Sequence, residues 1–449
     1  MFDKVLIANR GEIAARIARA CRALGVESAA IYSEADAHAL HVAAADEAHL
    51  CGPAPVRDSY LDMERVVSIA QRCGADAIHP GYGLLSENGA FADLCRGKGI
   101  AFIGPAGDVM RVMGDKVKSR QAMQRAGVPI VPGTTERLSD EEFGSWAQRI
   151  GLPVMVKASA GGGGRGMRLV RDASKLDKAV KRARSEAVSS FGDDGVYLEK
   201  LIESPRHIEI QVLADAHGNV VHLFERECSI QRRHQKVVEE APANAMTAKL
   251  RTALGKAAVA AARAVDYEGA GTLEFLVDAS GAFYFLEMNT RVQVEHPVTE
   301  LVTGVDIVQS MIRIAAGEPL ALEQDDVGLR GHAIEMRVYA EDPDRNFLPS
   351  PGTLEVWREP AAEGIRVDSG VREGDVVSVY YDPLLAKLIA WGVDRGEAIA
   401  RLSAALDDFE VAGIATTLPF HRRIARQAAF LEGRYDTGFI DTHMLGSRS

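Results

Sequence analysis

The 449-residue sequence lacks the features that mark several classes of protein. Its five cysteines show no C-x-x-C spacing, which argues against a zinc site or a disulfide framework. Cys228 alone has polar neighbours, and we interpret it as an ordinary small side chain. No apolar run approaches a membrane span, and residues 1–4 lead directly into an expected strand, so we expect neither a membrane segment nor a signal peptide. We expect a cytoplasmic protein.

Excess positive charge is also absent. The formal net charge is −11, which gives no support to nucleic-acid binding. The local basic cluster Gln231-Arg-Arg-His-Gln-Lys236 therefore binds a small anion or forms a solvated face. The 47% hydrophobic and 26% charged fractions are typical of a soluble globular protein, and the length indicates two or three domains.

Strand and helix patterns alternate at the start of the chain. Strands over residues 4–8 and 27–32 flank a helix over about 12–24, which indicates a parallel sheet. The turn at 8–12 has one glycine, so this unit is Rossmann-like without the phosphate fingerprint. A strand over 75–79 ends in Pro80-Gly-Tyr-Gly83. Open α/β sheets bind ligands at this edge, although a plain turn fits equally well.

The rest of the chain reads as a mixture of α/β and α+β structure. Residues 128–133 read as a linker, and a small α+β unit over about 134–203 is the size of a lid. Its expected elements are helices near 139–149 and 174–188 and a strand at 196–200. Further strands are expected at 207–213, 220–226, 272–277 and 282–288, with helices near 248–265 and 395–409. We expect three domains, over residues 1–113, 114–331 and 332–445.

The stretch KASAGGGGRGMRLV, residues 157–170, contains a four-glycine run. Ordering such a run costs backbone entropy, so it is kept where backbone approaches a ligand, usually phosphate, or moves. Gly161, Gly163 and Gly166 match G-x-G-x-x-G, but a strand follows instead of a helix, and there is no G-K-[ST]. We expect a β-hairpin tip like the glycine flap over ATP in kinases. A hairpin tip without a ligand is the alternative.

Five polar residues alternate with other residues in the segment after position 286: Glu287, Asn289, Arg291, Gln293 and Glu295. In an extended chain all five project to one face. Period-2 alternation is also compatible with a solvated strand face.

The strands at 272–277 and 282–288 are expected to form a hairpin. With a turn from Ala279 to Ala282, Glu274 lies opposite Glu287, and Asn289 extends the same face. Facing carboxylates destabilise a sheet unless a cation lies between them, and these oxygen ligands suit Mg²⁺. A phosphate-covering hairpin with a magnesium platform indicates phosphoryl transfer from a nucleotide.

These motifs resemble those of the ATP-grasp enzymes and, more narrowly, of the biotin carboxylase family. The resemblance covers nearly the whole chain. It rests on Ile7-Ala-Asn-Arg-Gly-Glu-Ile-Ala14, His79-Pro-Gly-Tyr-Gly83, Met113-Gly-Asp-Lys116, the glycine hairpin, Gln231 to Lys236, Glu287-Met-Asn, Glu295-His-Pro, Ile-Glu-Met-Arg337, Phe347-Leu-Pro-Ser-Pro-Gly352 and Tyr380-Tyr-Asp382. It implies a Rossmann-like N-terminal domain, an ATP-grasp central domain with a mobile lid and a C-terminal biotin carboxylase domain.

The resemblance implies a two-step activity. Mg·ATP and bicarbonate give carboxyphosphate and ADP, and the carboxyl group then passes to N1′ of biotin. Mg²⁺, or Mn²⁺, is implied at Glu274, Glu287 and Asn289. The implied ATP contacts are Lys116, Lys157, Gly161, Gly162, Gly163, Gly164, Gly166, Met167, Glu199, Lys200, Ile202, His207, Gln231, His234 and Leu276.

The remaining implied roles concern bicarbonate and biotin. Bicarbonate would contact Lys236, Arg291, Gln293 and Val294, since the forked donors of Arg291 match a planar oxyanion. Glu295 would take the bicarbonate proton. Arg337 would hold the ureido oxygen of biotin, with Tyr82 and Gly83 on the biotin side. The implied catalytic residues are Glu295, Arg291, Lys236 and Arg337.

The sequence lacks an Ala-Met-Lys-Met motif, so the biotinylated lysine must be on another protein or domain. We expect a biotin carboxyl carrier protein and carboxyltransferase subunits as partners, and a homodimer. The expected acceptor system is acetyl-CoA carboxylase, which feeds malonyl-CoA into fatty acid synthesis. Residues 381–387 also resemble other acyl-CoA carboxylases, so a different acyl-CoA or pyruvate carboxylase remains the alternative.

Two further points stay open. The second strand of the metal hairpin carries one residue more than the commonest turn in the family, which leaves its register open. The rival functions are an ATP-grasp ligase that makes an acyl phosphate and a nucleotide-sensing module with degenerate chemistry. Arg291, Glu295 and Arg337 argue against a ligase that makes an acyl phosphate. The carboxylate substrate of such a ligase would need no base to deprotonate it. Against the nucleotide-sensing module stands the presence of Glu274, Glu287 and Lys236, which degenerate chemistry would be expected to lose.

Overall fold

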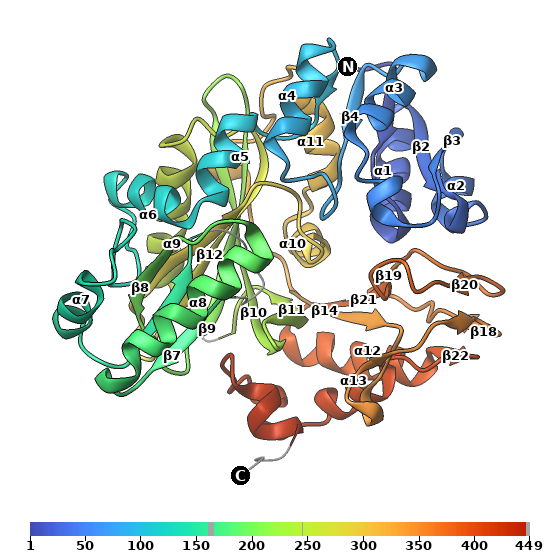
Figure 1. Cartoon of the computed structure of the whole chain (residues 1–449). Helices are drawn as coiled ribbons and strands as arrows, with labels where there is room; N and C mark the ends of the chain where they lie inside the picture. The colour runs from blue at the N-terminus through green and yellow to red at the C-terminus, as the bar shows by residue number, and fades with distance from the viewer. Residues whose placement is uncertain (160–165, 245, 446–449) are drawn as a thin grey trace.

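The computed structural model describes residues 1–159, 166–244 and 246–445 (Figure 1). The chain begins with a five-stranded parallel sheet in the order β3-β2-β1-β4-β5. This confirms the expected parallel sheet. Its elements are β1 (Lys4–Ile7), α1 (Gly11–Leu24), β2 (Glu27–Ser33), α2 (Leu40–Ala44), β3 (Glu47–Gly52), α3 (Met63–Cys73), β4 (Ala77–His79), α4 (Gly89–Gly97) and β5 (Ala101–Phe102).

The strands of this sheet are short, continuous apolar runs. Val5, Leu6 and Ile7 of β1 are each fully buried, as a central parallel strand with helices on both faces requires. Residues 8–10 and 80–83 follow β1 and β4 and therefore lie at the carboxyl edge of the sheet. Asn9 joins these two turns, because its amide Nδ2 donates to the carbonyls of Pro80 at 2.6 Å and Tyr82 at 2.8 Å.

The second part is a smaller unit with its own core, the lid that the sequence predicted. A three-stranded sheet in the order β7-β6-β8 packs on α8. The pairing of β6 with β7 is antiparallel, which confirms the expected hairpin. Gly161, Gly162, Gly163 and Gly164 lie outside the described residues. Its elements are α7 (Glu142–Ile150), β6 (Val154–Ala158), β7 (Arg168–Val170), α8 (Leu176–Phe191) and β8 (Val196–Lys200), and α5 (Gly107–Gly114) and α6 (Lys116–Arg125) precede it.

One long antiparallel sheet forms the body of the molecule. Its eight strands run in the order β13-β12-β9-β10-β11-β14-β21-β19. Because β11 pairs with β14, the sheet continues through the boundary expected at residues 331 and 332. The central elements are β9 (Arg206–Ala214), β10 (Val220–Arg232), β11 (Gln235–Ala241), α9 (Ala248–Arg263), β12 (Gly269–Val277), β13 (Phe283–Asn289), α10 (His296–Thr303) and α11 (Ile307–Ala315).

The C-terminal part completes this sheet and covers it with helices. Figure 1 shows the lid, the N-terminal sheet and the C-terminal helices placed around the long sheet. The elements are β14 (His332–Tyr339), β15 (Glu341–Asp342), β16 (Leu348–Pro349), β17 (Gly352–Thr353), β18 (Val356–Arg358), β19 (Ile365–Ser369), β20 (Val376–Val377), β21 (Leu384–Gly392), α12 (Arg395–Asp408), β22 (Glu410–Ala412), α13 (Leu418–Ala425) and α14 (Ala428–Leu431).

One local expectation differs from the structure, and one strand was not anticipated. The basic cluster at 231–236 is a tight hairpin between β10 and β11, with Arg233 and His234 at positive φ of 51° and 67°. The strand β11 was not anticipated, because two glutamates and a lysine in 235–241 mask its apolar residues. The alternating segment at 287–295 is strand only as far as Asn289. Arg291, Gln293 and Glu295 are carried by the loop before α10.

Candidate active site

A cavity of about 590 Å³ opens between the lid, the long sheet and the C-terminal part. A volume of this size is typical of a nucleotide or cofactor site. Nineteen of the residues that the sequence analysis singled out line it: Lys116, Lys157, Met167, Glu199, Lys200, Ile202, His207, Gln231, His234, Lys236, Glu274, Leu276, Glu287, Asn289, Arg291, Gln293, Val294, Glu295 and Arg337.

The cavity wall also includes residues that sequence reasoning missed. Thr437 and Asp441 reach the cavity from the C-terminal segment, more than two hundred residues after the lid. Their sequence context shows no pattern that would have identified them. Val131, Met155 and Leu286 supply apolar surface at the same cavity. Such surface fits a base or ribose, since ligand pockets are mostly apolar with few placed polar groups.

The lid end of the cavity holds cations that are each paired with a carboxylate. Lys157 on β6 and Glu199 on β8 form an ion pair across the lid sheet. Arg120 Nη1 binds the other oxygen of Glu199 at 2.5 Å. Burial would raise the pKa of Glu199, but Lys157 and Arg120 outweigh it and hold that pKa below its ordinary value. This carboxylate is therefore ionised and fixes the lysine ammonium in the cavity wall.

Lys116, at the start of α6, faces the hairpin of β12 and β13. Its Nζ lies 2.7 Å from Glu287 Oε2. Burial would lower the pKa of Lys116, but the Glu287 carboxylate outweighs it and raises that pKa. The lysine is therefore a positive charge next to the expected metal ligands, which is where the phosphates of a metal-bound nucleotide would lie.

The facing carboxylates are present in the expected register. Glu274 on β12 is paired with Glu287 on β13, and Thr272 with Asn289. The turn differs from the expected one, because Asp278 pairs with Ala282 and the loop between them has three residues. A bulge at Leu286 adds the compensating residue and restores the facing of the two glutamates. The bulge in β13 therefore accommodates the extra residue that the sequence analysis noted in this hairpin.

The oxygen donors of this hairpin fit a divalent cation. Glu274 Oε1 accepts bonds from Lys236 Nζ at 2.8 Å and from Asn289 Nδ2 at 2.9 Å. Burial would raise the pKa of Glu274, but Lys236 and His207 hold it well below its ordinary value. The His207 ring nitrogen Nε2 lies 3.1 Å from Glu274 Oε2. Three hard oxygen donors, two of them facing carboxylates, match the ligand preference of Mg²⁺.

The opposite end of the cavity centres on Lys236. Its Nζ contacts Glu209 Oε2 at 2.5 Å, Glu295 Oε1 at 2.6 Å and Glu274 Oε1 at 2.8 Å. Arg337 Nη2 reaches the second oxygen of Glu295 at 3.0 Å, and Nε binds Glu239 at 2.6 Å. Burial would raise the pKa of Glu295, but Lys236 and Arg337 hold it well below its ordinary range. One carboxylate thus bridges two cations.

A buried arginine supports this cluster from within the sheet. Arg226 on β10 is fully buried, and its Nε donates to Glu209 at 2.5 Å. Its other nitrogens donate to Gln211 and to Gln293 Oε1, each at 2.8 Å, and to Thr299 Oγ1 at 3.0 Å. From the sequence, an arginine in the middle of a strand is expected to be exposed. Only the structure shows that Arg226 is buried and holds the groups around Lys236.

Arg291 leaves the sheet and binds the N-terminal domain. Its Nε lies 3.0 Å from Glu87 Oε2, and its Nη2 donates to Asn289 Oδ1 at 3.0 Å. Burial would lower the pKa of Arg291, but Glu87 and Glu295 outweigh it and raise that pKa. The guanidinium therefore lies between the metal hairpin and Glu295, as an oxyanion site requires.

Tyr82 and Gly83 do not line the cavity in the described structure. The Tyr82 hydroxyl donates to Glu12 Oε1. Lys387 Nζ joins this pair to the cavity loop, because it lies 3.1 Å from Glu12 Oε1 and donates to the Val294 carbonyl at 3.0 Å. The side chain of Lys387 is fully buried where the three parts of the chain meet. The biotin contacts of Tyr82 and Gly83 remain a prediction.

Taken together, the fold and the site define an ATP-grasp ligase. A small lid sheet faces a larger antiparallel sheet that carries the facing carboxylates Glu274 and Glu287. Lys116, Lys157 and Lys236 line the cavity between the two sheets.

Comparison with known families narrows this class. Residues 1–110 match the model of the biotin carboxylase N-terminal domain, and residues 335–442 match that of the biotin carboxylase C-terminal domain. Residues 115–323 match the ATP-binding domain of the carbamoyl-phosphate synthase L chain. The chain belongs to the biotin carboxylase family, and its activity is the ATP-dependent carboxylation of biotin.

Two curated relatives span nearly the whole chain. A biotin carboxylase from Nostoc sp. is 53% identical over 440 residues, which is 98% of each chain. A pyruvate carboxylase subunit from Methanothermobacter thermautotrophicus is 52% identical over 447 residues, covering 99% of this chain and 91% of the relative.

Two solved relatives share the fold. Biotin carboxylase from Campylobacter jejuni, described as a complex with β-γ-ATP, is 47% identical with a TM-score of 0.96, and the match covers 99% of each chain. The biotin carboxylase domain dimer of 2-oxoglutarate carboxylase from Hydrogenobacter thermophilus, solved with MgADP, ADP and bicarbonate, is 50% identical with a TM-score of 0.94. That match covers 98% of this chain and 97% of the relative. ATP and Mg²⁺ are the nucleotide and the metal of this family.

No helix among the described residues is both long and apolar enough to cross a membrane.

Proposed function

We propose that this chain is the biotin carboxylase component of an acetyl-CoA carboxylase, with the carboxylated biotin supporting malonyl-CoA formation. The observation that favours this assignment is similarity, since biotin carboxylases from Nostoc sp. and Bacillus subtilis are 51% to 53% identical over 98% to 100% of this chain. The methylcrotonoyl-CoA carboxylase alpha subunits are longer, and the chain covers only 62% to 64% of them. A pyruvate carboxylase is the second candidate, because the pyruvate carboxylase subunit from Methanothermobacter thermautotrophicus is 52% identical over 99% of this chain.

In the first half-reaction, we assign bicarbonate to the space bordered by Arg291, Lys236 and Gln293. The oxyanion charge would be shared by the guanidinium and the ammonium. Glu295 is the proposed base. In the structure its two cations keep it ionised but weakly basic. Bound bicarbonate would attract Lys236 and weaken its contact with Glu295. The proton affinity of Glu295 would then rise at the step in which it deprotonates bicarbonate.

The nucleotide would lie at the lid end of the cavity. Lys116 and Lys157 supply fixed positive charges for its phosphates, and Glu274, Glu287 and Asn289 would hold Mg²⁺. Bound Mg²⁺ supplies charge neutralisation for the transferring phosphoryl group. The other ATP contacts that the resemblance implies are also proposed here, including those of Gly166, Met167, His207 and Leu276.

The second half-reaction needs a group that stabilises the ureido oxygen of biotin. Arg337 is the proposed donor. Its Nη2 lies beside Glu295, and its Nε is fixed by Glu239, so the guanidinium is oriented before biotin arrives. Preorganised donors of this kind stabilise developing charge without reorganisation. The phosphate released from carboxyphosphate is the candidate base for N1′.

The proposed partners follow from the missing biotinyl-lysine motif. A separate carrier protein would deliver biotin, and carboxyltransferase subunits would receive the carboxyl group. A homodimer is proposed because the domain from Hydrogenobacter thermophilus was solved as a dimer.

Reconstitution tests the acceptor. The purified chain is mixed with its carrier protein and, in parallel, with the acetyl-CoA and pyruvate carboxyltransferase components of its source organism. Incorporation of labelled bicarbonate into malonyl-CoA alone supports the proposal, and incorporation into oxaloacetate alone assigns the chain to a pyruvate carboxylase. The chain by itself should give no streptavidin signal yet carboxylate free biotin slowly, because the carrier's effective concentration is absent.

A further inference from the structure

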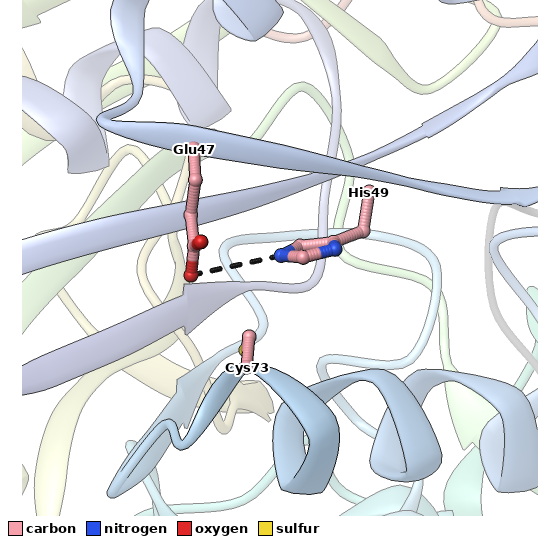
Figure 2. A group of neighbouring side chains, drawn as sticks. All are labelled: Glu47, His49 and Cys73. Carbon is pink, nitrogen blue, oxygen red and sulfur yellow. Dashed lines mark ion pairs between the residues drawn. The ribbon is translucent and has the colours of Figure 1, made fainter.

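A second cluster of metal-binding side chains lies in the N-terminal domain. Glu47 and His49 belong to β3, and Cys73 is the last residue of α3. One donor atom of each lies within 4.8 Å of the other two. Figure 2 shows the Glu47 carboxylate and the His49 imidazole pointing toward each other from the strand, with Cys73 below them at the end of the helix. We propose that these three residues form a binding site for a borderline transition-metal ion, with Zn²⁺ as the expected occupant.

The backbone explains why these residues meet. Positions 47 and 49 are two apart on one strand, so their side chains project from the same face. Helix α3 packs on β3, and its C-terminal end returns to the amino edge of the sheet before β4. The cluster is thus at the amino edge of the parallel strands. The turns that follow β1 and β4 are at the carboxyl edge, so this site is separate from the ATP cavity.

The donor atoms are poorly satisfied by the protein itself. His49 Nε2 is shielded from water and has no hydrogen-bond partner among the described residues. Its distance to Glu47 Oε1 is 3.6 Å, longer than a protein hydrogen bond. The Cys73 thiol makes only a 3.4 Å contact with the carbonyl of Ala70. Because a buried nitrogen without a partner costs free energy, an ion at this position would stabilise the cluster.

The donor types and the spacing suit zinc. Imidazole nitrogen, thiolate sulfur and carboxylate oxygen are its three usual protein ligands, and three of them leave one position for water. Ligands about 2.0–2.3 Å from the ion lie roughly 3.3–3.8 Å apart in a tetrahedron. A cluster within 4.8 Å therefore closes with side-chain movements of about 1 Å. The side chains of His49 and Glu47 are 30% and 39% exposed, so the ion has an entry path.

Lys4 is the main competitor for the site. Its Nζ lies 3.0 Å from Glu47 Oε1 and donates to the carbonyl of Cys73 at 3.3 Å. The ammonium has a second carboxylate, Glu27, at 3.2 Å, so it keeps an ion pair when Glu47 turns to a metal. The metal ligand could also be the free Oε2 of Glu47. Half-exposed ion pairs of this kind contribute little, so the competition is weak.

Metal binding at this site has a defined proton balance. The Cys73 thiol loses its proton to solvent as the sulfur–metal bond forms, and His49 binds through Nε2 with its proton on Nδ1. One proton is therefore released for each ion bound. No oxidant or reductant takes part.

Cobalt spectroscopy of the full-length chain tests the proposal, with Co²⁺ as the probe and excess Mg²⁺ present to occupy the cavity carboxylates. We expect one Co²⁺ per chain with a thiolate-to-cobalt charge-transfer band, which Zn²⁺ displaces. Cys73→Ser should abolish the band, and His49→Gln should weaken Co²⁺ affinity at least tenfold. The matched control is His38→Gln, an exposed histidine of the same domain, which should behave like the parent. Biotin carboxylase activity should be unchanged in all three variants.

A second measurement does not depend on any variant folding correctly. Cys73 is half-buried, whereas the other four cysteines are buried, so alkylation of the folded parent should modify Cys73 first. Zn²⁺ should protect this thiol, as mass spectrometry of the labelled peptide would show. Absence of a thiolate band in the parent overturns the proposal. So does a band that persists in Cys73→Ser, which would assign the metal to Cys228 beside Glu209 and Glu295.

Discussion

The two ends of the cavity hold their charges in different ways. At the lid end, Lys116 pairs with one carboxylate, Glu287, which is 35% exposed, and Lys157 pairs with Glu199 inside the small lid sheet. At the opposite end, Lys236 touches three carboxylates, and Glu295, which is only 2% exposed, bridges Lys236 and Arg337. The Lys116–Glu287 pair is partly solvated, so Lys116 can exchange the protein carboxylate for a substrate phosphate at small cost. In the network around Lys236 each buried charge depends on the others, so a substrate anion that draws Lys236 away also changes the remaining contacts.

The difference indicates a division of roles. We propose that the lid end binds the nucleotide and that the Lys236 end carries the chemistry. Arg226 fixes Glu209, a partner of Lys236, and Glu239 fixes Arg337. The comparison predicts that substitutions at the first end change ATP affinity, and that those at the second end change turnover or stability.

The largest effect is expected for Glu295→Gln. Without the carboxylate, bicarbonate keeps its proton, so bicarbonate-dependent ATP cleavage and biotin carboxylation should fall together by about 10²–10⁴-fold. Nucleotide affinity should barely change, because Glu295 contacts Lys236 and Arg337, whereas Lys116 and Lys157 pair with Glu287 and Glu199. Steady-state ADP release and labelled bicarbonate transfer measure the two rates. ATP cleavage near the parent rate would show that Glu295 only orients Arg337 and Lys236.

Arg226→Met tests whether the support behind Lys236 is structural. The substitution leaves Glu209 buried with one cation fewer, and loss of one partner of a buried pair costs about 3–5 kcal/mol. We expect a lower free energy of unfolding in urea and a lower kcat, with little change in the KM for ATP. Arg358→Met is the matched control, since Arg358 also lies on a strand but pairs with Glu410 where both side chains are more than half exposed. Equal losses in both variants would contradict the comparison.

Arg337→Ala separates the two half-reactions. The guanidinium is proposed to act after carboxyphosphate exists, so biotin carboxylation should fall by about 10²–10³-fold, as for loss of an oxyanion donor. Bicarbonate-dependent ATP cleavage should retain more of its rate. Both activities are measured on one preparation and compared with Glu295→Gln. If the two variants lose both activities in the same ratio, Arg337 has no role specific to biotin.

The smallest effect is expected for Lys157→Met at the lid end. Removal of one phosphate contact to a charged group costs about 1.5–3 kcal/mol, which predicts a roughly 10- to 150-fold rise in the KM for ATP. The kcat at saturating ATP should change less than the KM. Lys178→Met on α8 of the lid is the control, because Lys178 is exposed and does not line the cavity. An unchanged KM in Lys157→Met would remove this lysine from the ATP contacts.

Local sequence patterns were sufficient for much of the framework. Apolar runs such as Val5-Leu-Ile7 predicted the parallel strands, because burial on both faces demands continuous apolar residues. The hairpin that carries Glu274 and Glu287 was also predictable from strand length and turn residues. The bulge at Leu286 was not, because a bulge and a longer turn have the same residue count.

The candidate site likewise contains residues that the sequence predicted and residues that only the structure revealed. Glu274, Glu287, Lys236 and Glu295 could be proposed from sequence because their chemistry is concentrated in short motifs. Arg226 could not, since an arginine inside a strand gives no sign of which carboxylates surround it. Thr437 and Asp441 reach the cavity only because the C-terminal segment folds back along it.

The sequence by itself determined many of the strands and helices, the motifs and, through the order of those motifs, the family of this chain. Those features depend on neighbours a few residues apart, whose contacts are set by the periods of strand and helix. The tertiary structure alone decided which charges meet. Lys236 touches carboxylates from β9, β12 and the loop before α10, and Cys73 meets Glu47 and His49 although no cysteine spacing suggests a metal site. Such clusters arise between distant segments, because packing of the sheet and helices, and not proximity in the chain, brings their side chains together.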